Sequence, residues 1–414
     1  MRCLSACGHK RAHWSLRSMN RQFLDDRHLL RLADVTAADL ERNRKAIAEG
    51  RIHAKQAHVA VWFIPPVSHA LKGGVRTVFM FAEQFSRTYG TLNHFVVYSH
   101  NGVNLDAGPL SASLAENFPA LRFLVRVHRR GKDRIEDIPA SNFAFCTLWT
   151  TAYLMAKYHQ TSAKYYLVQD YEPNFYAAGT VFGAIEHTYR LGYSCIANTP
   201  GVGNACRRYT QDVVHFLPGV DTGTFRPNML KQATGEPKHL ILYGRPSNSR
   251  NCFALIAEMM VHLKQRMGKD ILIQSVGEAW READYGLEGV VENLGLLGSM
   301  AEVADLYRRA DMGLVFMMTP HPSYQPFEYM ASGCVVATNV NDANAWLLND
   351  DNALLLEPLP DVGSARIEQV LRDVGVWARL REGGLQAIAG LRWEAAFDVV
   401  RKRVMESPGP GDSV

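Results

Sequence analysis

Two arginines on one predicted loop are the residues best suited to binding chemistry. Arg245 and Arg250 follow the apolar run HLILYG and precede a segment of helical periodicity. Both guanidinium groups are therefore expected between the end of a strand and the start of a helix. Two such planar forks can hold a diphosphate through paired hydrogen bonds. The alternative is a pair of ordinary surface arginines, which are common and contribute little to stability.

A single acid, Glu328, stands in the stretch HPSYQPFEYMASGCVV, residues 321–336. The pattern predicts a short helix with Glu328 in its first turn, a stop at Gly333 and then the buried strand CVVAT. Burying a carboxylate is costly unless an opposing group compensates its charge. At the start of a helix, Glu328 can accept hydrogen bonds from ligand hydroxyls while free N–H groups hold an anion. The alternative is a glutamate that only caps the helix.

Two further loops after predicted strands carry candidate residues. Gly73 and Gly74 follow the first strand and allow a ligand to approach the backbone, beside the free N–H groups of a helix that begins near Val75. A simple tight turn is the alternative. Asp170 and Glu172 stand at the end of the run YYLVQD, where a polar loop with a capping acid is the other interpretation. Because ligands of open α/β sheets bind at the carboxyl ends of strands, these loops are expected to border one site.

The elements that must position these residues form two series. From about residue 58, β-branched and aromatic runs alternate with segments of helical periodicity, which is typical of βαβ units. One series runs from HVAVWFI to VHFLPG and the next from HLILYGR to ALLLEP. We therefore predict an α/β protein with two Rossmann-like domains whose parallel sheets face each other across a cleft. The expected parts are an N-terminal extension (1–55), an acceptor-side domain (56–220), a donor-side domain (221–390), a C-terminal helix that can pack back on the first domain (391–407) and a disordered tail (408–414).

Charge and hydropathy limit the classes of function. The chain of 414 residues has 45 Lys or Arg and 41 Asp or Glu, a formal net charge of +4. Its first twenty residues hold four of the basic residues and no acid, so the rest is neutral overall, which argues against nucleic-acid binding. Since no signal-peptide pattern and no run of about 20 apolar residues occur, we expect a cytoplasmic protein. Its basic start is compatible with a peripheral position at the inner membrane surface.

The cysteines argue against a disulfide framework or a metal site. There are seven, and most stand in apolar runs such as FAFCTL, which suits reduced and buried thiols. Cys3 and Cys7 are close together, but no matching Cys/His pair follows at the spacing of a zinc site. We therefore expect no metal.

Several segments together resemble one enzyme family. PFEYMASGCVVAT resembles the ribose-binding signature of retaining GT-B glycosyltransferases of family 4. In the same order as in that family, FLPGVDTGTFRP resembles its domain-junction segment, LYGRPSNSRN its phosphate clamp and NDDNALLLEP its closing strand. Within the family, QDYEPNFY and HPSYQPFEYMASG are similar to segments of bacterial rhamnosyltransferases that build S-layer and rhamnan chains. The resemblance implies a GT-B fold, a nucleotide-sugar donor held mostly by the second domain and an acceptor held mostly by the first.

The resemblance also implies a role for each matching position. Arg245 and Arg250 would hold the diphosphate and Glu328 the ribose, while Asp170 and Glu172 would orient the acceptor or balance positive charge. The other implied donor contacts are the base edge at Asn293, Leu294 and Gly295, the cleft-lining Gly73 and Gly74, Ser323 and Tyr324 ahead of the short helix, and Thr150.

The chain departs from the family pattern at two places. The first glutamate of the family motif should stand eight residues before Glu328, where this chain has Pro320. Many members carry a histidine where the segment FCTLWTTAY offers Thr150 and its neighbours. A donor sugar that lacks a hydroxyl, such as a 6-deoxyhexose, is compatible with both losses, and so is an inactive relative.

We therefore expect a retaining glycosyltransferase that moves a sugar, rhamnose or another 6-deoxyhexose, to a glycan or lipid-linked glycan in surface-polysaccharide synthesis. The donor would be dTDP-, UDP- or GDP-linked, with no cofactor. The alternatives are a nucleotide-sugar epimerase and a non-catalytic protein that binds sugar nucleotides or glycans. A Rossmann dehydrogenase is disfavoured because no G-x-G-x-x-G follows the first strand. A metal-dependent GT-A enzyme is disfavoured because no strand end offers an Asp-x-Asp site.

Overall fold

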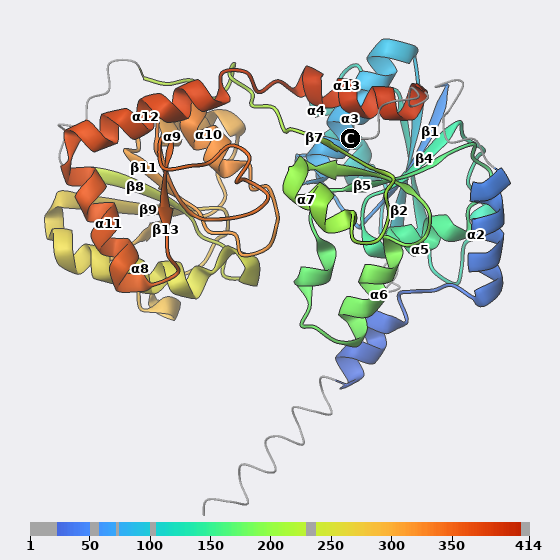
Figure 1. Cartoon of the computed structure of the whole chain (residues 1–414), viewed down its shortest axis with the longest axis horizontal. Helices are drawn as coiled ribbons and strands as arrows, with labels where there is room; N and C mark the ends of the chain where they lie inside the picture. Colours follow the sequence, from blue (N-terminus) through green and yellow to red (C-terminus); the bar gives the residue numbers. More distant parts are fainter. Residues whose placement is uncertain (1–22, 50–57, 72–73, 100–104, 229–236, 407–414) are drawn as a thin grey trace, which may run out of the picture.

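The computed structural model describes residues 23–49, 58–71, 74–99, 105–228 and 237–406. They form two α/β domains that lie side by side, each built around a parallel sheet (Figure 1). This confirms the predicted two-domain architecture. The predictions that concern Gly73, Cys3, Cys7 and the tail at 408–414 lie outside the described residues, as does most of the segment KQATGEPK between the two series.

The sheet of the first domain has seven strands in the order β3-β2-β1-β4-β5-β6-β7, and every neighbouring pair is parallel. Its strands are β1 (Val59–Ile64), β2 (Leu92–Ser99), β3 (Phe123–Arg129), β4 (Phe143–Cys146), β5 (Lys164–Val168), β6 (Ser194–Asn198) and β7 (Val213–Phe216). Its helices are α2 (Ala37–Glu49), α3 (Val75–Tyr89), α4 (Gly108–Asn117), α5 (Trp149–Lys157), α6 (Thr180–Thr188) and α7 (Thr199–Cys206), with the short 3-10 helices η1 (Ile135–Asp137) and η2 (Glu172–Phe175).

The sheet of the second domain has six parallel strands in the order β10-β9-β8-β11-β12-β13. Its strands are β8 (Lys238–Tyr243), β9 (Ile271–Val276), β10 (Glu292–Asn293), β11 (Met312–Leu314), β12 (Val335–Asn339) and β13 (Ala353–Leu356). Its helices are α8 (Phe253–Met267), α9 (Met300–Arg309), α10 (Gln325–Ala331), α11 (Pro360–Arg372) and α12 (Val374–Ile388), with η3 (Ser249–Asn251), η4 (Gly268–Asp270) and η5 (Glu282–Tyr285).

The apolar strand sequences explain why both sheets are sandwiched between helices. In β1, the run VAVWFI is buried at every position after the first. Alternate side chains enter different cores: Val61 and Phe63 join one cluster, while Ala60, Trp62 and Ile64 join the other. A parallel sheet covered on both faces requires such continuously apolar strands. The helices therefore cover the faces and leave the strand ends free for a site.

The last helix, α13 (Trp393–Met405), crosses from the second domain and lies on the first (Figure 1). Its buried residues Phe397, Val400 and Val404 belong to the core cluster of the first domain. The crossing brings the chain close to Gly219, where a Cβ atom would lie 2.2 Å from the Trp393 backbone nitrogen. A side chain at 219 would therefore push apart the two stretches of chain that connect the domains.

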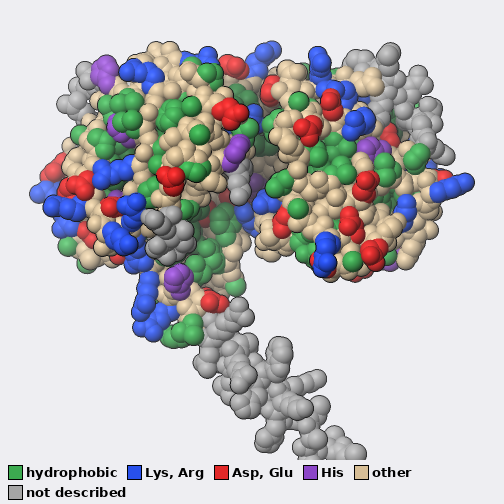
Figure 2. Space-filling view, turned by 180° about the vertical axis from the view of Figure 1, so that it is seen from behind, with side chains coloured by type: hydrophobic (Ala, Val, Ile, Leu, Met, Phe, Trp, Pro, Cys, Tyr) green, Lys and Arg blue, Asp and Glu red, His purple; other side chains and the backbone are tan. Residues whose placement is uncertain are grey.

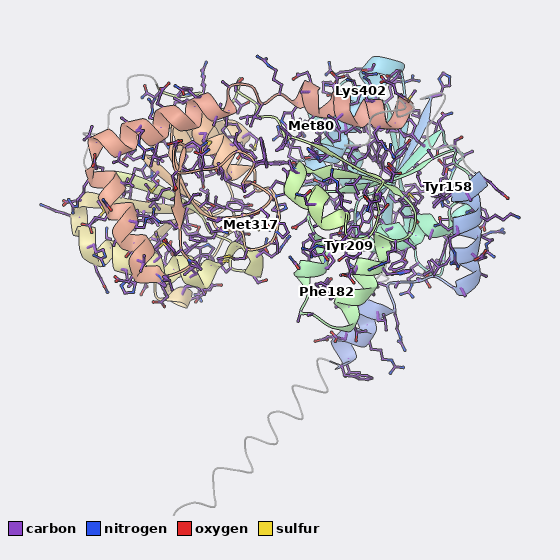
Figure 3. The ribbon with its side chains drawn as sticks, viewed as in Figure 1. Met80, Tyr158, Phe182, Tyr209, Met317 and Lys402 are labelled. Atoms are coloured by element: carbon purple, nitrogen blue, oxygen red, sulfur yellow. The ribbon has the colours of Figure 1, made fainter. Side chains whose placement is uncertain are left out.

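Two strands are shorter than the sequence predicts. The apolar runs predict strands throughout residues 289–295 and 312–318, whereas β10 has two residues and β11 has three. Beyond β11 the backbone N–H of Met317 donates to the side chain of Asn339 in β12 at 2.8 Å instead of to a backbone carbonyl of that strand. Side-chain amides replace the ladder here because the segment leaves the sheet toward the first domain, and Met317 lies on the side that faces it (Figure 3).

Candidate functional site

The strand order places one switch point in each sheet. In the first sheet the order reverses between β1 and β4, and in the second between β8 and β11. Ligands of such folds bind beyond the carboxyl ends of the strands at these points. The space-filling view shows two lobes that meet along one side and are separated by an open notch on the other (Figure 2). Contacts between the loops after β5, β8 and β11 show that the carboxyl ends of both sheets border this gap.

Arg245 and Arg250 both lie in the loop between β8 and α8, at the switch point of the second sheet. The loop is tightly built, because a Cβ atom at Gly244 would lie 2.2 Å from Ser275 Oγ and Cys252 adopts a left-handed φ of 54°. The Arg250 guanidinium lies 4.1 Å from the centroid of the Phe175 ring, which belongs to the first domain. The two arginines thus share one loop, and the Arg250 side chain reaches the first domain.

Asp170, which follows β5, is the partner of Arg250 across the gap. Its Oδ2 atom forms an ion pair with Arg250 Nη1 and lies 3.3 Å from His321 Nδ1. The Asp170 side chain is only 6% exposed. Burial raises its pKa above the ordinary value, and His321 and Arg250 oppose that shift. Burial lowers the pKa of His321, and the neighbouring Asp170 carboxylate opposes that shift.

Glu328 lies in the first turn of α10, as predicted, with Gly333 in a left-handed φ of 73° at the helix end. Burial raises the pKa of Glu328 to about 7, and Arg76 on α3 of the first domain opposes that shift. Asp221, in the segment that joins the domains, adds to the increase. Arg76 therefore supplies the opposing charge that the sequence required but did not identify.

Tyr324 behaves differently from the prediction of a donor contact. Its hydroxyl lies 3.1 Å from Thr77 Oγ1 on α3 and accepts a hydrogen bond of 2.8 Å from the side-chain amide of Asn198 at the end of β6. Its ring packs edge-on against Trp393 with centroids 5.7 Å apart. Tyr324 therefore connects the second domain to three elements of the first, and its hydroxyl is already engaged.

We expect Tyr324→Phe to lower the free energy of unfolding by about 1–2 kcal/mol, because it removes two hydrogen bonds and leaves Thr77 and Asn198 unsatisfied at the domain contact. Urea unfolding of both proteins measures this difference. Tyr285→Phe, which changes a tyrosine that is 44% exposed, is the control and should be neutral. Equal stability of the Tyr324 variant and the wild type would contradict a connecting role.

Glu172 is also placed differently from the prediction that it orients an acceptor. Its Oε2 accepts a hydrogen bond of 2.7 Å from the Trp149 backbone N–H, and its Oε1 accepts one of 2.9 Å from the Tyr166 hydroxyl. The side chain is 2% exposed. Burial raises its pKa to about 8. Glu172 thus caps the start of α5 inside the first domain, and neither oxygen is free to contact a substrate.

The remaining predicted site residues are Ser323, Thr150 and Gly74, and each lies just before or at the start of a helix. Ser323 is buried, and its hydroxyl donates to the Gln325 side chain. Thr150 is buried in the first turn of α5, which follows β4. At Gly74 a Cβ atom would lie 2.6 Å from the side-chain oxygen of Gln169, so the turn before α3 is closely packed.

The predicted base edge, residues 293–295, lies at the end of β10 on the carboxyl side of the second sheet. The Asn293 side chain accepts from the Gly295 N–H at 3.1 Å and donates to the Trp280 carbonyl at 2.8 Å. The Leu294 N–H donates to the Ser275 carbonyl at 2.9 Å. These bonds fix the backbone of the segment, with Gly295 at a left-handed φ of 67°.

Several buried polar atoms near these strand ends lack a hydrogen-bond partner among the described residues. A buried polar atom without a partner costs about 1–3 kcal/mol, so such a concentration marks a place where a polar ligand binds favourably. Thr199 adds backbone strain, with a φ of 78° that a β-branched residue rarely adopts. The atoms are Thr150 Oγ1, Asp170 Oδ1, Asn198 Oδ1 and Thr199 Oγ1 in the first domain and Asn251 Oδ1, Thr319 Oγ1 and His321 Nδ1 in the second.

Sequence reasoning missed two site residues, Arg76 and His321. Arg76 stands in the first turn of the helix that follows the Gly-Gly turn, which the sequence predicts to face the gap. His321 directly follows Pro320, the position at which the family motif is interrupted. Both residues stand close to the end of a predicted strand, and this position was the signal by which they could have been found.

Among the described residues, no group of three or more His, Cys, Asp or Glu side chains has an arrangement that could hold a metal ion.

The chain is similar in sequence to a known protein family and to a protein of Myxococcus xanthus. Residues 238–367 match the family described as the C-terminal domain of WsaF. The chain is 36% identical over 373 residues to the O-antigen biosynthesis protein RfbC of Myxococcus xanthus, which corresponds to 89% of this chain and 29% of that protein. The chain therefore spans less than a third of that relative.

No helix within the described part of the chain has the length and apolar character needed to cross a membrane.

Solved structures with the same two-domain arrangement cover most of the chain. Sucrose-phosphate synthase from Thermosynechococcus elongatus has a TM-score of 0.63 at 14% identity and covers 83% of this chain and 98% of its own. HepE from Anabaena, in complex with UDP and glucose, has a TM-score of 0.62 at 15% identity and covers 84% and 97%. The chain thus has the GT-B fold of glycosyltransferases, and its residues 238–367 are similar to the C-terminal domain of WsaF.

Proposed function

We propose that the chain is a glycosyltransferase that takes a sugar from a nucleotide-diphosphate donor and adds it to a glycan in surface-polysaccharide synthesis. The observation that carries the proposal is that charged side chains of the two domains face each other at two places, where Arg250 pairs with Asp170 and where Arg76 acts on Glu328. The likeness to a protein named for O-antigen biosynthesis and to a fold seen with UDP and glucose supports the same conclusion.

In this proposal each donor group has a partner of matching chemistry. The diphosphate lies against Arg245 and Arg250 and the N-terminal end of α3, because guanidinium forks and free backbone N–H groups both bind phosphate oxygens. The ribose hydroxyls donate to the ionised Glu328 carboxylate. The base lies along the fixed backbone of residues 293–295. A nucleotide-sugar has both a diphosphate for the arginines and ribose hydroxyls for the carboxylate. A simple phosphate ligand has only the first of these groups.

Transfer breaks the bond between the anomeric carbon and the leaving phosphate oxygen and forms a bond from that carbon to the acceptor oxygen. The acceptor proton passes to the departing phosphate oxygen, and the sugar passes through an oxocarbenium-like state. Arg245 and Arg250 stabilise the negative charge that develops on the diphosphate. One such electrostatic donor contributes about 2.7–4 kcal/mol to lowering the barrier. Because the proton leaves with the phosphate, attack on the same face and retention of configuration follow.

We further propose that the sugar is rhamnose or another 6-deoxyhexose. Pro320 and the segment around Thr150 lack side chains that the wider family uses at the sugar, and a sugar with one hydroxyl fewer needs fewer polar partners. A screen of thermal unfolding with dTDP-, UDP- and GDP-sugars tests the donor, since a ligand at a hundred times its Kd stabilises by about 2.7 kcal/mol.

The reaction itself is tested by supplying the stabilising donor with and without a glycan acceptor. Glycosylated product with the anomeric configuration of the donor sugar supports the proposal. A changed sugar without acceptor would instead identify an epimerase. Binding of donor with neither hydrolysis nor transfer across a panel of acceptors would point to a non-catalytic binding protein.

Glu328→Gln should weaken donor binding by about 10-fold or more, because hydrogen bonds to a charged acceptor contribute about 1.5–3 kcal/mol. Since the pKa of Glu328 is about 7, wild-type affinity should increase as the pH rises from 6 to 8 and the carboxylate ionises. The variant should lose this pH dependence. Calorimetric titration with UDP and dTDP at both pH values measures it, and identical affinities in both proteins would reject the ribose role.

A further inference from the structure

Arg250 already has a charged partner in the gap. Asp170 Oδ2 pairs with Arg250 Nη1, so a carboxylate of the first domain occupies a guanidinium that the proposed function assigns to the donor diphosphate. The pair joins the loop after β5 to the loop after β8 and is largely buried, with side chains 6% and 26% exposed. Asp170 takes an Arg250 N–H group that a two-point contact with phosphate would use, so the two anions compete for this guanidinium.

The surroundings of Asp170 allow it to exchange partners. His321 Nδ1 lies 3.3 Å from the same Oδ2 atom, and Asp170 Oδ1 is buried without a hydrogen-bond partner among the described residues. A carboxylate that lost Arg250 would therefore still have the imidazole beside it. Its Oδ1 atom would also be available to accept a hydrogen bond from a ligand. The Tyr324 contacts to Thr77 and Asn198 do not involve Arg250, so they keep the domains together during the exchange.

We propose that Asp170 and the donor diphosphate compete for Arg250, so that donor binding releases Asp170, beside His321, to accept a hydrogen bond from an acceptor hydroxyl next to the one that reacts. This inference rests on the proposed function and adds an order of events to it. Before the donor arrives, the pair with Arg250 holds the Asp170 carboxylate away from the position that the acceptor requires. After the donor arrives, the acceptor hydroxyl is oriented at the sugar. The same exchange suppresses unproductive binding of acceptor without donor.

The proposal predicts that removal of an acid improves nucleotide binding while it impairs transfer. Asp170→Asn should bind UDP or dTDP about tenfold more tightly than the wild type, because Arg250 no longer has a charged competitor. At the same time, kcat for transfer should fall. The control is Asp361→Asn, since Asp361 also pairs with an arginine, Arg266, at 2.6 Å, but on the outer side of the second domain. That variant should bind nucleotide like the wild type.

A double-mutant cycle separates competition from a general effect of charge. If Asp170 acts by holding Arg250, then Asp170→Asn should tighten binding in the wild-type background and have little effect in the Arg250→Ala background. Equal tightening in both backgrounds, or none in either, would overturn the proposal. The Asn side chain is isosteric with Asp, and the thermal midpoint of each variant verifies that it folds. If Arg250→Ala binds UDP and dTDP as well as the wild type does, the proposed function fails first, and the competition fails with it.

Discussion

Replacing Arg250 with alanine should lower kcat for sugar transfer by about 10²–10³-fold, because one electrostatic donor to a developing negative charge contributes about 2.7–4 kcal/mol. Arg250 stands at the switch point of the second sheet and reaches across the gap to Asp170. In the proposed reaction it stabilises the leaving diphosphate. Nucleotide affinity should also fall, by a smaller factor, because the charge on the diphosphate increases as the bond to the sugar breaks.

Initial rates at saturating donor, together with calorimetric titration of UDP and dTDP, separate these two effects. Arg245→Ala should show a loss of the same kind. Arg372→Ala is the matched control, because this arginine on α11 is 46% exposed and pairs with Glu368 within the same helix. Unchanged kinetics and affinity in both Arg245→Ala and Arg250→Ala would remove the diphosphate assignment.

Glu172→Gln should change the pH dependence of stability more than the substitution of any exposed carboxylate in the first domain. The pKa of Glu172 is about 8 in the fold and 4.5 ordinarily, so between these values the folded chain keeps a proton that the unfolded chain loses. Stability therefore falls as the pH rises through this window, by about 1.4 kcal/mol per pH unit from this group. Glu328, with a pKa of about 7, acts in the same direction.

A glutamine cannot ionise but can still accept the hydrogen bond from the Trp149 N–H. The wild type should therefore lose about 3 kcal/mol of unfolding free energy between pH 5.5 and pH 8.5 because of this group, and Glu172→Gln should not. Urea unfolding at the two pH values measures this difference. Glu116→Gln, an exposed change on α4, should differ from the wild type by the same amount at both pH values. The same result for Glu172→Gln would show that this carboxylate is not held protonated in the fold.

The fold could be predicted from the sequence because it is determined mainly by short apolar segments that form the strands. Runs such as VAVWFI and CVVAT are apolar throughout, and only strands covered on both faces require that. The lengths of β10 and β11 were not accessible, because their ends are set by partners distant in sequence. Beyond the end of β11, for example, the Met317 N–H bonds to the side chain of Asn339 in β12 and not to the backbone of that strand.

The places of the candidate residues in the fold were predictable from the sequence, but the partners of their side chains were not. Arg250 and Glu328 follow from strand ends and helix starts, which are local signals. Glu172 turns inward because Trp149, 23 residues earlier in the chain, begins a helix that needs a cap. The Tyr324 hydroxyl is bonded to Thr77 and Asn198, which belong to the other domain and are distant in sequence. No local pattern specifies such contacts between distant segments.

A crystal structure with UDP or dTDP bound tests the central claim most directly. We predict diphosphate oxygens within hydrogen-bond distance of Arg245 and Arg250, ribose hydroxyls on Glu328, and Asp170 no longer paired with Arg250. A nucleotide bound elsewhere, or one whose diphosphate touches neither arginine, would contradict the proposed site and the reaction derived from it.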